Sequence, residues 1–396
     1  MYAHSRIDGP LRIAQVAPLY ESVPPKLYGG TERVVSYLTE ELVRQGHEVT
    51  LFASGDSVTN AKLISPCRRS LRLDKGCVDP LAPHLLMLER VFQPAGRFDI
   101  IHFHCDYLHF PLSRRQKCPH VTTLHGRLDI RELGPLYREF SEIPVVSISD
   151  AQREPLACAN WQGTVHHGLP DGLHTLREQP GDYLAFLGRI SPEKGVDQAI
   201  EIARRSGRRL KIAAKIAAAD EDYFHQSIEP LLSQSKAIVE FVGEVGGKDK
   251  EEFLRNAYAV LFPIDWPEPF GLVMIEAMAC GTPVIAYRRG SVPEVMEHGV
   301  TGFVVEGLEE AVKAVELVAA LSRKRCRQIF EKRFTTARMT RDYLQIYRRL
   351  VEANAPKAHR ISADDFSSRA ITKGQRARLD PGCVGVWPVR GHWNIS

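Results

Sequence analysis

The chain has 396 residues, of which 44% are hydrophobic and 25% are charged, so it can form two domains and is unlike a disordered, collagen-like or coiled-coil chain. Its eight cysteines are spread along the chain without a Cys-x-x-Cys pair, which argues against a zinc ribbon or a disulfide scaffold and favours a reducing compartment. No stretch approaches the roughly 18 apolar residues of a spanning helix and the N-terminus has no apolar segment, so the sequence predicts a cytoplasmic protein without a signal peptide.

The excess positive charge lies at the C-terminal end. The formal net charge of the chain is +4, and residues 354–396 alone carry seven Lys or Arg against three Asp, which also gives +4. Residues 1–353 are therefore neutral overall, so the charge balance predicts no nucleic-acid partner. Because residues 354–396 lack helical periodicity and contain several Pro and Gly, they are typical of an appended, disordered basic tail.

The first half of the chain alternates short apolar runs, typical of strands, with helical patterns. The predicted strands are 11–17, 48–53, 99–104, 120–125, 144–149 and 164–167. Between the first two, residues 31–44 place their apolar side chains on one face of a helix. This alternation predicts right-handed βαβ units around a parallel sheet, which form an N-terminal domain of residues 1–170.

A second series of the same kind follows a linker near residues 168–182. Its predicted strands are 183–187, 210–214, 238–242, 259–262 and 283–287. They predict a second Rossmann-like domain over residues 171–334, and the last helical stretch, 335–351, is placed to pack back on the first domain. Open parallel sheets bind ligands outside the carboxyl ends of their strands, so two such sheets in tandem predict an interdomain cleft.

The segment 265–286 is the most informative for chemistry. It follows a predicted buried strand and opens a helix, and Gly271 would let the backbone approach a ligand closely. The backbone amides of Phe270, Gly271 and Leu272, together with the helix dipole, predict an anion site suited to phosphate groups.

Two carboxylates bracket this predicted anion site. Glu268 lies in the loop before it, and Glu276 lies inside the helix that follows. Because a carboxylate does not bind phosphate, both are placed to accept hydrogen bonds from hydroxyls on either side, as a sugar and a ribose would offer. The alternative is that the helix dipole alone favours Glu near a helix start.

The amino-acid sequence of this segment is similar to a signature of a known family. Glu-Pro-Phe-Gly-Leu at 268–272, followed from 276 by Glu-Ala-Met-Ala-Cys-Gly-Thr-Pro-Val-Ile, resembles the donor-binding signature of family 4 retaining glycosyltransferases, which have the GT-B fold. The resemblance extends over about residues 11–351 and includes matches to the family's glycine loop, its basic loop and a turn beside the base. The further donor-binding positions that it implies are Gly29, Gly30 and Gly243.

The resemblance implies an α/β fold of the GT-B type, with two doubly wound Rossmann-like domains facing across a cleft. It also implies that Arg189 and Lys194 stabilise the leaving nucleoside diphosphate without a metal ion, which agrees with the charge that develops there. His125 would face the donor sugar, Glu268 would bind its hydroxyls, and Glu276 would bind the ribose. The expected catalytic residues are Arg189, Lys194, His125 and Glu268.

Together these features predict a retaining glycosyltransferase that moves a hexose from a UDP-, GDP- or ADP-linked sugar to a hydroxyl acceptor on a glycan, a lipid or a small molecule. No cofactor and no metal ion is expected. One alternative is a nucleotide-sugar epimerase or another GT-B enzyme. The other is a non-catalytic, two-lobed sugar-binding protein.

Three further signals lead to weaker predictions. Asp220-Glu-Asp222 matches the metal motif of the other glycosyltransferase fold, but the residues after it favour a helix start. The basic run 68–75 would suit lipid headgroups or an anionic acceptor, although a solvated loop is the simpler interpretation. His102 and His104 share one face of a strand, and we expect that region to line the cleft rather than to bind a metal.

Overall fold

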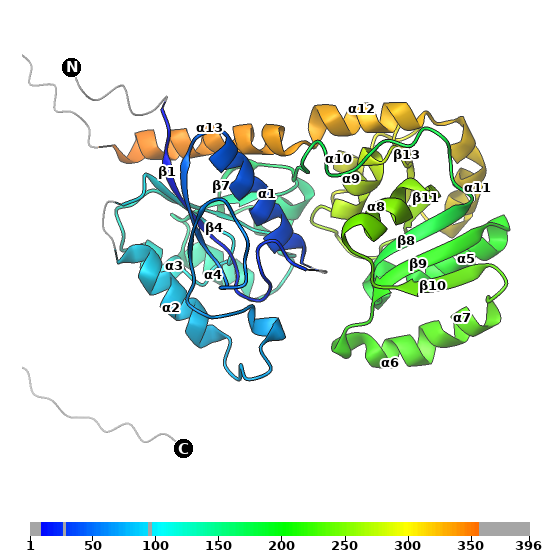
Figure 1. Ribbon diagram of the computed structural model, residues 1–396, viewed down its shortest axis with the longest axis horizontal. Helices are drawn as coiled ribbons and strands as arrows, with labels where there is room; N and C mark the ends of the chain where they lie inside the picture. Colours follow the sequence, from blue (N-terminus) through cyan, green and yellow to red (C-terminus); the bar gives the residue numbers. More distant parts are fainter. Residues whose placement is uncertain (1–8, 27–28, 94–96, 356–396) are drawn as a thin grey trace, which may run out of the picture. The chain divides into compact units, whose positions relative to one another are not determined.

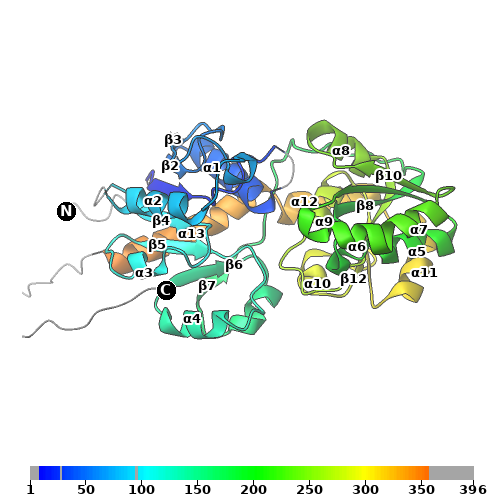
Figure 2. The same cartoon turned by 90° about the horizontal axis from the view of Figure 1, so that it is seen from below.

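The computed structural model describes residues 9–26, 29–93 and 97–355, which form two α/β halves, each built on a parallel sheet (Figures 1 and 2). This confirms the predicted fold class. Apart from Asn354 and Ala355, the predicted basic tail lies outside the described residues. Within the described ranges, no helix is long and apolar enough to cross a membrane.

In the described residues the first sheet has seven parallel strands in the order β3-β2-β1-β4-β5-β6-β7. They are β1 Arg12–Val16, β2 Glu48–Phe52, β3 Lys62–Ile64, β4 Ile100–Phe103, β5 His120–Thr123, β6 Pro144–Ser147 and β7 Asn160–Thr164. The predicted strand 164–167 is wrong, because β7 ends where that prediction begins. β7 is a half-buried edge strand of sequence Asn-Trp-Gln-Gly-Thr, which has too few apolar residues to show in the sequence.

The described part of the second sheet has six parallel strands in the order β10-β9-β8-β11-β12-β13. They are β8 Tyr183–Arg189, β9 Arg209–Lys215, β10 Val239–Gly243, β11 Ala257–Phe262, β12 Val284–Tyr287 and β13 Gly302–Val305. All five predicted strands are present. The sixth, β13, is a short edge strand that the sequence pattern missed.

Helices cover both faces of each sheet. In the first half they are α1 Gly30–Arg44, α2 Leu81–Phe92, α3 Phe110–Ser113 and α4 Leu133–Glu139. In the second half they are α5 Val196–Ser206, α6 Glu221–Tyr223, α7 Glu229–Gln234, α8 Gly247–Arg255, α9 Leu272–Ala279, α10 Val292–Val295, α11 Leu308–Leu317 and α12 Arg323–Arg333. The last helix, α13 Thr336–Asn354, returns to the first half and lies beside α1 (Figure 1).

α13 is part of the core of the first half. Its buried side chains Met339, Tyr343 and Tyr347 pack in one cluster with Val34 and Leu38 of α1. The opposite face of the first sheet is covered by a second cluster that includes α2. The chain therefore crosses between the halves twice, once in each direction.

The two crossing segments are joined directly to each other. The amide of Leu169 donates to the carbonyl oxygen of Phe334 at 2.8 Å, and the amide of Thr336 donates to the carbonyl oxygen of Leu169 at 2.9 Å. Thr335 then caps α13 by accepting a hydrogen bond from the amide of Arg338 at 3.2 Å. The outgoing and returning chains are thus held together as one short connection.

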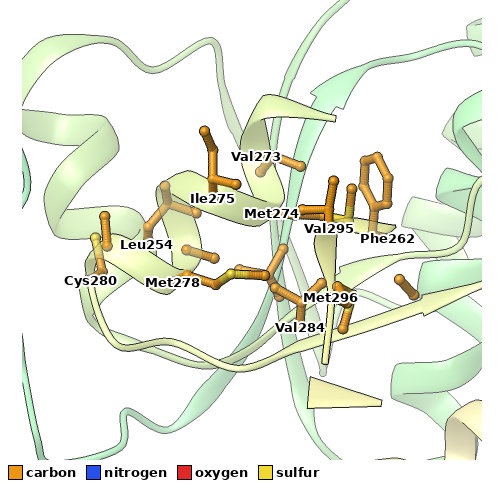
Figure 3. Close-up of a cluster of buried hydrophobic side chains, with 14 of the residues drawn as sticks. Leu254, Phe262, Val273, Met274, Ile275, Met278, Cys280, Val284, Val295 and Met296 are labelled. Carbon is orange, nitrogen blue, oxygen red and sulfur yellow. The ribbon is translucent and has the colours of Figure 1, made fainter. Parts of the chain in front are cut away.

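α9 is buried on all sides in the second half. Figure 3 shows Met274 and Met278 of this helix among Leu254, Val284 and Met296. Each of these apolar side chains contributes about 1.5–3 kcal/mol of burial free energy. Such a helix has no solvent face, so a charged residue on it, here Glu276, needs a partner inside the protein.

Arg323 at the start of α12 fixes the end of α9. Its guanidinium donates to the hydroxyl of Thr282 at 2.6 Å and to three carbonyl oxygens, those of Arg177 at 2.6 Å, Arg255 at 2.9 Å and Ala257 at 3.0 Å. Burial lowers the pKa of Arg323 to about 10. This one side chain connects the linker, β11 and the loop after α9, and so holds the element that carries Glu276.

Candidate functional site

A pocket of about 780 Å³ is lined by residues of both halves. Many of them lie at or just beyond strand ends, those of β1, β4 and β5 in the first half and of β8, β9 and β11 in the second. The pocket therefore lies at the carboxyl ends of the strands, where parallel sheets bind ligands. Its volume suits a ligand the size of a nucleotide sugar.

Lys194 and Glu268 form a close ion pair in this pocket. The Lys194 Nζ atom lies 2.5 Å from Glu268 Oε2, which also accepts a hydrogen bond from Trp266 Nε1 at 2.9 Å. The ammonium lies 4.8 Å from the centroid of the Trp266 ring. Gly195, at φ 68°, brings the loop of Lys194 so close to the end of β11 that a Cβ atom there would lie 2.1 Å from the carbonyl oxygen of Pro263.

Arg189 lies at the end of β8 and contacts two carboxylates. Its guanidinium lies 2.5 Å from Glu193 Oε1 and 3.4 Å from Asp220 Oδ2. Asp220 precedes α6, so the predicted helix start is confirmed. Asp220 therefore neutralises a cation of the pocket.

Glu276 has a partner that the sequence analysis did not identify. Lys250 of α8 lies 2.5 Å from Glu276 Oε1, and both side chains are largely buried. Burial alone would raise the pKa of Glu276, but the charges of Lys250, His174 and Arg33 and the Lys250 hydrogen bond together lower it. The carboxylate is therefore ionised, and it lines the pocket. Lys250 follows no motif in the sequence, so only the fold reveals it.

The start of α9 faces the same pocket. Gly271 precedes the helix at φ 76°, and a Cβ atom there would lie 2.7 Å from Met274 Cε and 3.0 Å from Phe262 Cζ. Phe270, Gly271 and Leu272 all line the pocket. The first amides of a helix have no acceptor within it, so they are available to an anionic group.

The glycine loop lies across from this helix start. Gly29 and Gly30 line the pocket, and a Cβ atom on Gly30 would come within 3.6 Å of Leu272 Cδ1. The predicted base turn follows β10, where Glu244, Val245 and Gly246 are lining residues and Gly243 is not. The structure thus gathers every predicted site residue except Gly243 around one pocket.

His125 lies two residues beyond β5 and contacts other histidines. Its Nε2 atom is 2.9 Å from Nδ1 of His104, and its ring stacks on that of His167 at a centroid distance of 5.4 Å. The edge of His167 in turn meets Phe270 at 4.8 Å. Burial lowers the pKa of His125 to about 3 and holds the pKa values of His104 and His167 well below their usual range. All three imidazoles are therefore neutral.

The part of the chain that the structure describes contains no group of three or more His, Cys, Asp or Glu arranged to hold a metal ion. The rings of His102 and His104 do share a face, with centroids 4.0 Å apart, and their nitrogens are used in hydrogen bonds. His104 lines the pocket, as expected of this region, whereas His102 is fully buried and is not among the lining residues.

Family comparisons identify both halves of the molecule. A model of glycosyltransferase family 4 matches residues 28–151, and a model of group 1 glycosyl transferases matches residues 175–333. The class that the fold and the site define is therefore that of a GT-B glycosyltransferase. The chain belongs to the family 4 glycosyltransferases, as its motifs predicted.

Several known proteins are similar over most of their length. AviGT4, a glycosyltransferase involved in avilamycin A biosynthesis, is 26% identical, with a TM-score of 0.67 over 87% of this chain and 98% of that one. Phosphatidyl-myo-inositol mannosyltransferase of Mycobacterium leprae is 26% identical over 78% of this chain and 87% of its own. Anabaena HepE, solved with UDP-glucose, is 18% identical and shares the fold, with a TM-score of 0.64 over 86% of this chain and 100% of that one.

The buried neutral histidines predict that stability falls on the acid side of neutrality. A histidine whose pKa is lower in the folded than in the unfolded state contributes stability that is fully present above its unfolded pKa, about 6.5. Below that pH, each such histidine lowers the free energy of unfolding by about 1.4 kcal/mol per pH unit. The urea midpoint, measured from pH 7.5 to pH 5.0, should therefore decline.

The exposed His225, which pairs with Glu229 at the surface, provides the control. His225→Gln should leave the decline unchanged, because its side chain is solvated in both states. A urea midpoint that is constant between pH 6.5 and pH 5.0 would contradict the neutral assignment.

Proposed function

We propose that this protein transfers a hexose, with retention of configuration, from a nucleotide diphosphate sugar to a hydroxyl acceptor. One observation carries the proposal: two lysine–carboxylate pairs, Lys194 with Glu268 and Lys250 with Glu276, flank the open start of α9 in a single pocket. A nucleotide diphosphate sugar carries its diphosphate between the hydroxyls of the sugar and those of the ribose. In the pocket, the start of α9 likewise lies between the two carboxylates. HepE, which has a similar fold, was solved with UDP-glucose, and this supports the choice of ligand.

In this proposal the donor replaces the internal partners of the pocket. The diphosphate would lie between the amides that begin α9 and the cations Arg189 and Lys194, while Glu268 turns to hydroxyls of the sugar. Glu276 would accept hydrogen bonds from the ribose, with Lys250 still beside it. Each buried charge has a partner before and after binding, so binding leaves none of them unpaired.

The proposed reaction uses the leaving group itself. The bond between the anomeric carbon and the diphosphate oxygen breaks, the acceptor oxygen bonds to the same face, and the acceptor proton passes to the departing phosphate. Arg189, Lys194 and the helix start would stabilise the negative charge that develops on the diphosphate. Because those groups supply the positive potential, we propose that no metal ion takes part.

The acceptor is proposed to bind in the part of the pocket formed by the first half. Tyr20, Asp106 and Tyr107 line that part. Asp106 is held at φ 49°, a left-handed conformation that is uncommon for residues other than glycine. These side chains offer hydrogen bonds and a ring surface to a hydroxyl-bearing acceptor.

The surface beside this acceptor region combines apolar and basic side chains. α2 exposes Leu81, Leu85 and Leu86 at 49%, 50% and 55%. The preceding run 68–75 contains four Lys or Arg, of which Arg72 also lines the pocket. We propose that this surface contacts anionic lipid, because leucines that insert into the lipid and cations that face its headgroups both favour such binding.

Glu276→Gln should weaken binding of the nucleoside diphosphate. A carboxylate that accepts ribose hydroxyls contributes about 1.5–3 kcal/mol for each charge-assisted bond, so the dissociation constant should rise roughly 10- to 100-fold for one such bond. Titration calorimetry with UDP, GDP and ADP measures it. The matched control is Glu252→Gln on the exposed side of α8, which should bind as the wild type does. Equal affinity of the Glu276 variant would remove this residue from the site.

Donor turnover should persist in excess EDTA, because protein cations supply the charge stabilisation. The assay follows transfer to added acceptor mixtures, or slow donor hydrolysis, with UDP-, GDP- and ADP-linked glucose and mannose. Retention is read from the anomeric configuration of the product. Turnover that is lost on chelation and restored by Mg²⁺ or Mn²⁺ would disprove the metal-free mechanism. Absence of turnover with every donor would favour a sugar-binding protein.

The α2 surface predicts binding to vesicles of phosphatidylglycerol but not of phosphatidylcholine. Replacing both exposed leucines, Leu85→Ser with Leu86→Ser, should reduce binding to anionic vesicles in cosedimentation at least about tenfold, because each leucine that inserts into the lipid contributes about 1.5–3 kcal/mol. Val58→Ser, at an exposed apolar position elsewhere in the first half, is the control. Equal binding to both lipids, or to neither, would exclude this docking surface.

A further inference from the structure

A chain of hydrogen bonds between buried side chains runs from His125 into the first half. His125 Nε2 lies 2.9 Å from His104 Nδ1, and His104 Nε2 lies 2.8 Å from Gln15 Oε1. Gln15 sits on the interior strand β1 and is fully buried, as a polar side chain seldom is. Neither His104 nor Gln15 belongs to the family motifs quoted above.

The chain continues from Gln15 to the last helix. Gln15 Nε2 donates to the hydroxyl of Tyr347 at 3.1 Å, and that hydroxyl lies 2.6 Å from His102 Nδ1. His102 Nε2 is 2.7 Å from Thr123 Oγ1, which is 2.9 Å from the hydroxyl of Tyr343. All of these side chains are buried, so water does not replace any of the partners.

The orientation of the Gln15 amide fixes the direction of every bond toward His125. Because the NH₂ group donates to Tyr347, the carbonyl oxygen faces His104 and can only accept, so His104 Nε2 carries a proton. His104 is neutral, so its Nδ1 atom has none and accepts from His125 Nε2. His125 is neutral as well, and its Nδ1 atom is therefore a bare acceptor.

Nδ1 of His125 is buried and has no hydrogen-bond partner among the described residues. His125 lines the pocket. A buried acceptor without a partner costs free energy, so the site favours a ligand that brings a donor to this atom. A sugar hydroxyl can donate, whereas an ionised phosphate oxygen can only accept.

We infer that Gln15 and His104 are positioning residues, which set the tautomer of His125 so that its Nδ1 lone pair receives a hydroxyl of the transferred sugar. The identity of the sugar rests on the proposed function, but the tautomer does not. His125 then acts as a neutral acceptor that orients the donor sugar, and the proton on Nε2 stays on the side away from the ligand. The hydrogen-bond chain behind it excludes the opposite tautomer.

The tautomer can be measured without a ligand. In the full-length protein labelled with ¹⁵N-histidine, the His125 resonances, assigned with a His125→Asn variant, should show protonated Nε2 and unprotonated Nδ1. Gln15→Met removes the amide at nearly constant volume and should populate the other tautomer. Tyr347→Phe leaves Gln15 without its acceptor and should shift the population in the same direction by less, which keeps the test usable if Gln15→Met does not fold.

Ligand affinity gives a second readout. Gln15→Met should weaken UDP-glucose about tenfold while UDP binds unchanged, since only the sugar meets His125 and one hydrogen bond with its unpaired partner is lost. GDP-mannose and GDP serve in the same way if they bind the wild type more tightly. The matched control is Thr122→Val, at the position of β5 next to Thr123. It removes the hydroxyl that lies 2.7 Å from Nε2 of the buried His109. It should lower stability without changing the ratio of the two affinities.

A His125 that carries its proton on Nδ1 in the wild type would overturn the inference. So would a Gln15→Met protein with an unchanged tautomer, or with an unchanged ratio of nucleotide-sugar to nucleotide affinity. If the wild type binds none of these nucleotides, the proposed function fails. The ligand-free spectra still decide whether Gln15 sets the tautomer.

Discussion

The structure depends on one constraint, that a parallel sheet covered by helices on both faces is open only at its strand ends. In the first half, α1 and α13 cover one face and α2 covers the other, so polar side chains on the strands have no solvent to face. Those that point inward must find partners within the protein, as Gln15 and His102 do. Those at the strand ends or just beyond them, such as Arg189 and His125, line the pocket. Site and buried polar network thus have the same physical origin.

The charges of the pocket follow a similar rule. Glu276 stands on a helix that is buried on all sides, and an unpaired carboxylate there would be very unfavourable. Lys250 removes this cost, as Lys194 does for Glu268. A ligand that offers phosphate to Lys194 and hydroxyls to both carboxylates can enter the pocket without leaving a charge unpaired, because Lys250 stays beside Glu276. The ion pairs therefore both stabilise the ligand-free fold and define the chemistry of a suitable ligand.

The sequence was enough to predict the fold class, because its apolar runs alternate with helical patterns at the spacing of βαβ units. It also predicted the residues of the pocket that occur in long motifs, such as Glu268 and Gly271. It could not predict Lys250, since the contact with Glu276 joins two helices and depends on how they pack. Gln15 and Tyr347 are 332 positions apart, and neither has a local pattern that reports their hydrogen bond. Edge strands such as β7 were missed because half-buried strands need few apolar residues.

The return of α13 to the first half connects these features. Its tyrosines anchor the far end of the hydrogen-bond chain, and they are packed in the same core as β1 and α1. Any movement between the halves must bend the chain where it crosses, at the paired segments around Leu169 and Thr335, which precede α13. The helix therefore moves with the first sheet, and the hydrogen bonds that orient His125 are kept. Phe270 belongs to the other half, so such a movement would change its contact with His167, whereas the stacking of His167 on His125 and the tautomer of His125 lie within the first half.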